Sequence, residues 1–235
     1  MPIWLAPESS THADDSRFDH ISANLFLHLS PRSYRKIGVI VAAILGHRQI
    51  MLVPDPRFDP EPKARAVLKA GTLYAISGDS GWIYYGQVAP EKSIGFFQRR
   101  DRDLAQPEDV LSSQIMSRVG VVYPSIGRAL RSGRWKMLGR FSVHEELEKT
   151  HFAVQWPLAP LGALRVTVWA GSKPAYDTHV EDPAIQQMEI IAGWDAEHHI
   201  PARLKADFGD PDAEWHIGGP VWRERRVRAQ QGLLV

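Results

Sequence analysis

Short runs of apolar and β-branched residues, separated by turn residues, fill most of the chain from residue 64 onward. Two such runs, at 72–77 and 82–88, flank the segment Gly78-Asp79-Ser80-Gly81. Asp, Ser and Gly favour tight turns, because glycine accepts positive φ and the short polar side chains bond the local backbone. The pattern therefore predicts a β-hairpin. Further strands are predicted at 94–98, 113–123, 135–143, 152–156 and 164–169, with 135–143 and 152–156 expected to pair.

Helices are predicted where a capping residue and a proline precede an apolar pattern. Ser30-Pro31 begins one such segment, whose apolar residues recur at helical spacing. A short helix is expected at 125–131, and Asp182-Pro183 opens another that continues to about residue 191. Together with the strands, these helices predict an α+β fold. We expect a strongly bent antiparallel sheet, or a small and partly open barrel, with helices packed on it.

The chain before the strand-rich part reads as an extension. A polar tail at 1–29 is followed by the first helix, and four prolines between 54 and 62 predict an extended linker. We therefore divide the chain into an extension, 1–63, and an α+β domain, 64–235. Met51 is an alternative start of the chain, and the intact mass of the native protein would test it.

Composition excludes several classes of site. Hydrophobic residues make up 44% of the chain and charged residues 23%, as in a globular domain, and the formal net charge is +1. The chain has no cysteine, which excludes disulfides, thiolate nucleophiles and Cys-ligated zinc and fits a cytoplasmic location. The longest apolar run, 37–45, is far shorter than the about 20 residues that a membrane-spanning helix needs. We therefore expect no membrane association.

The sequence Gly-Asp-Ser-Gly at 78–81 resembles the segment around the nucleophile of trypsin-like serine proteases. That mechanism needs a histidine base, a buried aspartate and an oxyanion hole, which a match of four residues does not supply. In that family the serine also follows most of two β-barrels, whereas a tail, a helix and a linker precede Ser80 here. The turn interpretation is therefore preferred, and Ser80 is not predicted to be a nucleophile.

Asp195 and His199 are the strongest metal-ligand candidates. If the segment around them is helical, their spacing of four residues places both side chains on one face, within reach of one ion. No third ligand is specified, so a polar helix end is the competing interpretation. A metal-dependent hydrolase centred on this pair is our first alternative function.

Two arginine-rich stretches, 99–103 and 222–226, lie next to aromatic residues, an arrangement that can hold phosphates and stack bases. Acidic residues interrupt both stretches, which favours a surface with ion pairs instead. The balanced net charge also argues against nucleic-acid binding. No phosphate-binding glycine motif is present. A nucleic-acid-associated module is therefore our second alternative function.

Aromatic residues follow the predicted turn at Trp82, Tyr84 and Tyr85. Side chains alternate along a strand, so Trp82 and Tyr84 share one face and Tyr85 lies on the other. Trp and Tyr are favoured at the energetic centres of protein interfaces. These three residues are therefore candidate contacts with a protein partner.

A group of short motifs lies between residues 69 and 156. They are Gly71-Thr72-Leu73-Tyr74-Ala75-Ile76, Tyr85-Gly86-Gln87-Val88, Val121-Val122-Tyr123, Ser132-Gly133-Arg134-Trp135 and Leu138-Gly139. In these motifs the span resembles the immunity protein 26 family of bacterial polymorphic-toxin systems. The resemblance marks Gly71, Gly86, Gly133, Trp135 and Gly139 as family-motif residues with structural roles.

The resemblance implies a cytoplasmic binding protein of a bacterium. Such a protein binds a cognate toxin and occludes it, with no catalysis and no cofactor of its own. The family pattern names no contact residues, so none is transferred to this chain. Toxin neutralisation is therefore the function that we expect first.

Overall fold

The structure is a computed structural model that describes residues 56–78, 81–156, 165–211, 213, 219–230 and 232. Residues 51–235 form one compact unit and residues 1–50 another. All described residues belong to the unit formed by residues 51–235. The predicted N-terminal tail and helix lie outside the described residues, and so do Asp79 and Ser80 of the predicted turn.

The larger of two sheets has six strands in the order β10-β4-β3-β2-β1-β5. Neighbouring strands are antiparallel except β10 and β4, which are parallel. The predicted hairpin is confirmed, because β1 and β2 pair from Leu73 with Gln87 to Ser77 with Ile83. The strands are β1 (Thr72–Ser77), β2 (Ile83–Val88), β3 (Ile94–Asp101), β4 (Ile115–Val121), β5 (Trp135–Arg140) and β10 (Gly193–Trp194).

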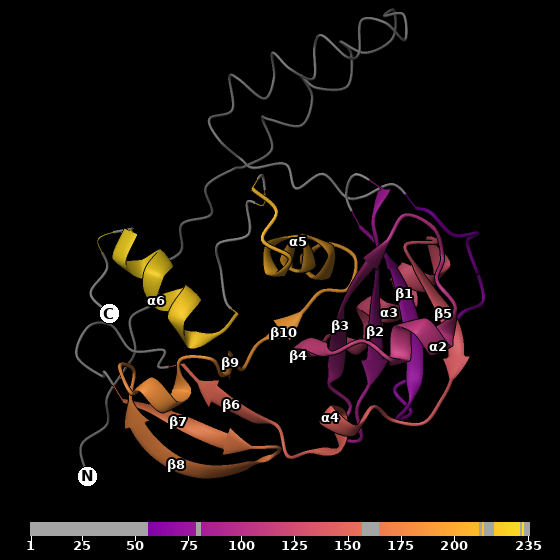
Figure 1. Ribbon diagram of the computed structural model, residues 1–235. Coiled ribbons are helices and arrows are strands. Elements are labelled where there is room, and N and C mark those ends of the chain that lie inside the picture. Colours follow the sequence, from indigo (N-terminus) through magenta and orange to yellow (C-terminus); the bar gives the residue numbers. More distant parts are fainter. Residues whose placement is uncertain are drawn as a thin grey trace, which may run out of the picture. The chain divides into compact units, whose positions relative to one another are not determined.

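This sheet curls strongly into half of a barrel, as Figure 1 shows. Irregularities in strand pairing accompany the curl, since a bulge bends its strand and increases the local twist. The predicted α+β class with a strongly bent sheet is confirmed. The register shifts lie between Leu73 and Tyr74, between Tyr84 and Gly86, and between Phe96 and Phe97.

Both faces of the central strands are covered, so every residue of β1 and β2 is buried. One face packs against α3 (Tyr123–Arg131) and α5 (His199–Asp207). The opposite face packs against α2 (Pro107–Leu111), which contributes Val110 to a second cluster. Helix α3 confirms the short helix predicted at 125–131.

A second sheet has four strands in the order β8-β7-β6-β9 and was not predicted. Its strands are β6 (Phe152–Gln155), β7 (Arg165–Ala170), β8 (Lys173–His179) and β9 (Glu189–Ile190). Its core joins valines and isoleucines of the sheet to Val221 at the start of α6 (Val221–Gln230). This helix contains the second arginine-rich stretch, 222–226.

The predicted pairing of 135–143 with 152–156 is wrong. Strand β5 pairs with β1, whereas β6 pairs with β7 and β9. Between β5 and β6, the short helix α4 (Glu145–Glu148) buries Leu147. Leu147 packs against Gly95 of the larger sheet, where any added Cβ would lie 2.3 Å from Leu147 Cδ2. The chain therefore leaves the larger sheet after β5 and begins the smaller one.

The helix predicted from Asp182 is also wrong in extent. Asp182 Oδ1 accepts a hydrogen bond from the backbone N–H of Ala184 at 2.9 Å, as a cap should. Only a 3₁₀ turn follows (Pro183–Ile185), because the chain returns to form β9. Ile185 and Ile190 are both buried in the core of the smaller sheet, which this return makes possible. Within the described ranges, no helix has the length and apolar character needed to cross a membrane.

The segment from β9 to β10 connects the two sheets. Strand β9 runs parallel to β6, and β10 runs parallel to β4. Backbone hydrogen bonds hold both ends, from Ile191 N–H to Val154 O and from Val122 N–H to Trp194 O, each at 2.8 Å. Arg118 of β4 and the residues that directly precede β6 line one pocket.

Candidate functional site

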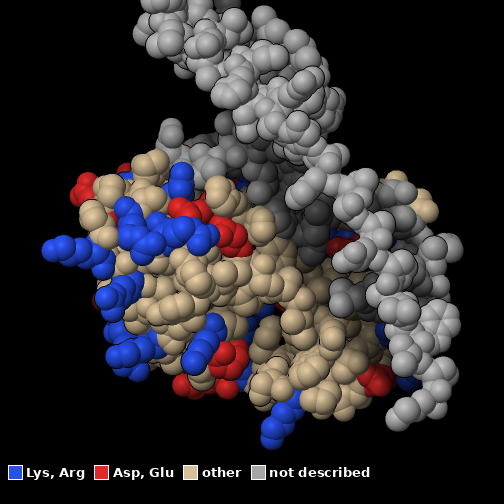
Figure 2. Space-filling model, turned by 180° about the vertical axis from the view of Figure 1, so that it is seen from behind, with Lys and Arg blue, Asp and Glu red and all other residues tan. Residues whose placement is uncertain are grey.

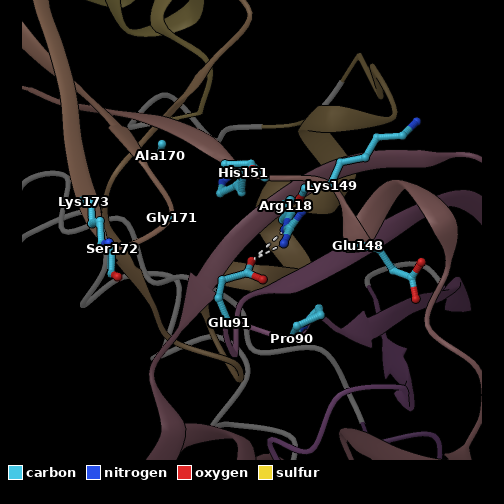
Figure 3. A pocket seen from close by; sticks show the side chains of 11 residues that line it. Pro90, Glu91, Arg118, Glu148, Lys149, His151, Ala170, Gly171, Ser172 and Lys173 are labelled. Carbon is cyan, nitrogen blue, oxygen red and sulfur yellow. Dashed lines mark hydrogen bonds and ion pairs between the residues drawn. The ribbon is translucent and has the colours of Figure 1, made fainter.

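A pocket of about 420 Å³ lies where the two sheets meet. Its walls come from the turn between β2 and β3, from β4, from the segment that joins α4 to β6, and from the turn between β7 and β8. In Figure 3, Ser172 and Lys173 lie on one side and the pair of Glu91 and Arg118 on the other. The pocket is thus bounded by parts of the chain that are distant in sequence.

Arg118 of β4 forms a fixed wall of this pocket, and its side chain is only 9% exposed. Its Nε donates to Glu91 Oε1 at 2.8 Å and to Ser93 Oγ at 3.1 Å. Its Nη1 donates to the carbonyl oxygen of Lys149 at 3.0 Å, and its Nη2 pairs with Glu91. Since all three guanidinium nitrogens are engaged, Arg118 is held in one orientation.

Glu91 is held in its ionised form. Burial raises the pKa of the Glu91 carboxyl, but hydrogen bonds from Arg118 and Ser93 outweigh that effect, so the pKa is lowered overall. The Arg118–Glu91 pair therefore carries both charges at neutral pH, and the two charges largely cancel.

His151 lies beside this pair (Figure 3). Burial and, next, the positive charge of Arg118 lower the pKa of the His151 imidazole, while Glu91 opposes them. The ring is therefore neutral at neutral pH, with one nitrogen as a donor and the other as an acceptor. It makes no hydrogen bond or ion pair with any described residue.

Asp195 and His199 do not share a helix face. Helix α5 begins at His199, and Asp195 lies in the turn before it. Asp195 Oδ1 accepts from the backbone N–H groups of Glu197 and His198 at 2.9 and 3.1 Å. Asp195 Oδ2 pairs with Arg128 at 2.7 Å, and His199 Nδ1 accepts from the Asp195 N–H at 3.3 Å. Both side chains thus accept hydrogen bonds from backbone N–H groups in the turn that leads into α5.

The described part of the chain brings no third ligand to Asp195 and His199. Among the residues that the structure describes, no group of three or more His, Cys, Asp or Glu side chains could hold a metal ion. Glu197 is also committed elsewhere, since it pairs with Arg128 and Arg134 at 3.0 and 2.9 Å. These ion pairs fasten the β10–α5 segment to α3 and to the start of β5.

The aromatic residues proposed as partner contacts divide between core and surface. Tyr84 and Tyr85 are 1% and 0% exposed, so neither can contact a partner, which corrects that part of the expectation. Tyr84 stacks on Phe208, which follows α5. Trp82 is partly exposed, and its ring lies against the guanidinium groups of Arg100 and Arg102.

The arginine-rich stretches are largely engaged in ion pairs, as their interleaved acids predicted. Arg99 pairs with Asp101 at 2.8 Å, and Arg100 pairs with Asp210 at 2.7 Å. Figure 2 shows basic and acidic side chains next to one another on the face seen there. In the second stretch, Arg223 pairs with Asp207 and Arg225 with Glu181. Arg99 pairs within its own strand, whereas Arg100, Arg223 and Arg225 each pair with a residue of another element or loop.

The residues that the resemblance marked as structural occupy turns, strands and buried positions. Gly71 and Gly133 have φ values of +84° and +73°, and an added Cβ at either would lie 2.1 Å from a backbone oxygen. The oxygen near Gly133 belongs to Phe58, whose N–H donates to Gly133 O at 3.1 Å. That contact holds part of the proline-rich segment against the domain. Trp135 is buried, and its Nε1 donates to Ala196 O at 3.0 Å. Gly86 and Gly139 lie on β2 and β5.

Sequence reasoning missed the pocket, because no local motif marks it. Glu91, Arg118, His151 and Ser172 stand in four separate segments that only the pairing of strands brings together. His151 was visible as one of ten histidines, without a ligand spacing to single it out. Comparison with family models, curated proteins and solved structures found no match to this chain.

Proposed function

We propose that this protein is an immunity-type binding protein that neutralises a cognate bacterial toxin by occluding it. One observation carries the proposal. Most of the motifs of the resemblance lie on three neighbouring strands, β2, β1 and β5, and in the turns next to them. The residues on which the resemblance rests therefore belong to one structural unit of this chain, which supports the proposal.

Trp82 is the candidate contact residue that this proposal retains. It is the partly exposed member of its aromatic group, and it directly precedes β2. A large aromatic ring with arginines beside it has the composition that interface centres favour. Tyr176 of β8 offers a matched control, since it is a 43% exposed aromatic residue of the other sheet.

Co-expression tests the proposal. The full chain is produced in cells together with the product of the adjacent gene, and growth is followed. We expect the chain to restore growth and to co-purify with that product. We expect Trp82→Ala to weaken rescue and Tyr176→Ala to leave it intact, with folding of both variants checked by circular dichroism. Growth arrest despite abundant folded protein would refute toxin neutralisation.

A further inference from the structure

The pocket between the sheets combines a fixed wall with a set of unused polar groups. The fixed wall is the Arg118–Glu91 pair, in which every guanidinium nitrogen already has a partner. Thr150, Ser172 and Lys173 are exposed at the rim of the pocket, and His151 is half-buried in its wall. The side chains of these four residues make no hydrogen bond or ion pair with any described residue. Polar groups that line a pocket and have no partner within the protein can exchange their bound water for a ligand.

The charged residues of the pocket indicate the charge that a bound ligand would carry. The charged residues that line the pocket are three basic ones, Arg118, Lys149 and Lys173, and two acidic ones, Glu91 and Glu148. In Figure 3 the side chains of Lys149 and Glu148 extend away from the centre, so Lys173 remains after Arg118 and Glu91 cancel. Counting all five charged residues leaves one excess positive charge, and so does counting only those that face the centre. A ligand with a single negative charge would balance it.

Hydrogen bonding narrows the chemistry further. Lys173, Ser172 and Thr150 offer donors, and a carboxylate accepts from several donors at once. Neutral His151 offers one acceptor and one donor on the opposite side, which suits a hydroxyl group on the same ligand. The volume of about 420 Å³ lies within the range of small-molecule sites.

We propose that this pocket binds a small monocarboxylate that also carries a hydroxyl group. The carboxylate faces Lys173 and Ser172 on the β7–β8 turn, and the hydroxyl faces His151. The ligand contacts both sheets, so its binding stabilises their junction. This proposal is independent of toxin neutralisation, because it concerns a small molecule and needs no protein partner.

Nuclear magnetic resonance on the full-length, isotope-labelled protein tests the proposal. Sodium lactate is the hydroxycarboxylate probe, with methylammonium chloride and inorganic phosphate as the other arms. We expect lactate to cause saturable shifts of the His151 ring and Ser172 amide signals and to raise the pKa of His151, because an adjacent negative charge favours the imidazolium. Methylammonium should cause neither change.

A charge reversal supplies the matched variants. Lys173→Glu should weaken lactate binding about tenfold or more, since it replaces a charge-assisted hydrogen bond by repulsion. Lys136→Glu makes the same change on an exposed residue of β5 and should leave binding unchanged. The proposal is overturned if lactate causes no saturable shift, if methylammonium or phosphate alone reproduces the shifts, or if Lys173→Glu binds lactate as tightly as Lys136→Glu.

Discussion

Arg203 of α5 and Glu189 of β9 form a buried ion pair, with Arg203 Nη2 2.6 Å from Glu189 Oε1. Their side chains are 2% and 12% exposed. Helix α5 packs on the six-stranded sheet, and β9 belongs to the four-stranded one, so the pair connects the two sheets. Arg203 also pairs with Asp207, at 3.2 Å from Nε. The junction therefore depends on charges that have lost their hydration.

Glu189→Gln should destabilise the protein. The variant keeps the size of the side chain but leaves the buried Arg203 charge with Asp207 as its remaining ion-pair partner. Removing one member of a buried pair typically costs about 3 kcal/mol or more, and Asp207, which Arg203 shares with Arg223, compensates the remaining charge only in part. Urea denaturation should show a loss of that order in the free energy of unfolding.

Glu181→Gln is the control for this prediction. It removes the same charge from a pair with Arg225 at 3.5 Å, in which the Glu181 side chain is 60% exposed. Exposed pairs contribute under about 1 kcal/mol, so the loss should be small. Equal losses from the two variants would show that burial of the Glu189 pair does not matter to stability.

Gly71→Ala should be far more disruptive than Gly171→Ala. Both glycines have positive φ, +84° and +60°, so both variants carry the strain of a left-handed alanine, about 1 kcal/mol. At Gly71 the new Cβ would also lie 2.1 Å from Phe141 O, whereas nothing lies within 4 Å at Gly171. We expect a total loss of about 3 kcal/mol for Gly71→Ala, from strain and overpacking together. Thermal unfolding of both variants measures the difference, and similar losses would contradict the contact argument.

Local signals in the sequence predicted the elements whose structure depends on near neighbours. The hairpin of β1 and β2 formed because apolar runs flank turn residues, and α3 formed after a proline that suits a first turn. The strong bend of the larger sheet was also expected. The hairpin and α3 are each encoded within a few residues along the chain, whereas the bend also involves the pairing of strands.

Contacts between residues distant in sequence determine the features that the sequence did not predict. Tyr84 looked like a surface aromatic, because strand alternation cannot reveal that helices cover both faces of the sheet. Asp182 caps a turn as predicted, but the pairing of β9 with β6 stopped the helix. The pocket around His151 depends on four segments and therefore left no mark in any single window of sequence.

His151 should make the protein less stable in mild acid. Burial and Arg118 lower the pKa of its imidazole in the folded state, whereas an unfolded histidine takes up a proton near about pH 6.5. Just below that pH the unfolded chain binds more protons than the folded one, so stability falls as pH falls. His151→Gln removes this contribution and should flatten the dependence of unfolding free energy on pH in that window. An NMR titration that gives His151 its ordinary pKa or a higher one would refute the prediction.

Tyr74 and Tyr85 should make the protein less stable in alkali. Burial is the largest influence and raises the pKa of each phenol to about 12, against about 10 for an unfolded tyrosine. Between those values the folded chain holds protons that the unfolded chain has released, so stability is present below about pH 10 and is lost as pH rises towards 12.

Tyr74→Phe separates two effects of the Tyr74 hydroxyl on stability, its hydrogen bonds and its ionisation in alkali. The Tyr74 hydroxyl donates to Val67 O at 2.8 Å and accepts from Val67 N–H at 3.0 Å, so the variant should lose about 1 kcal/mol of stability at neutral pH. Above about pH 10 the loss should shrink, because the variant has one fewer buried phenol to ionise. Phenolate absorbance of the native protein, followed against pH, measures the titration directly. If both phenols ionise near pH 10 while the fold is intact, burial does not protect them and the prediction fails.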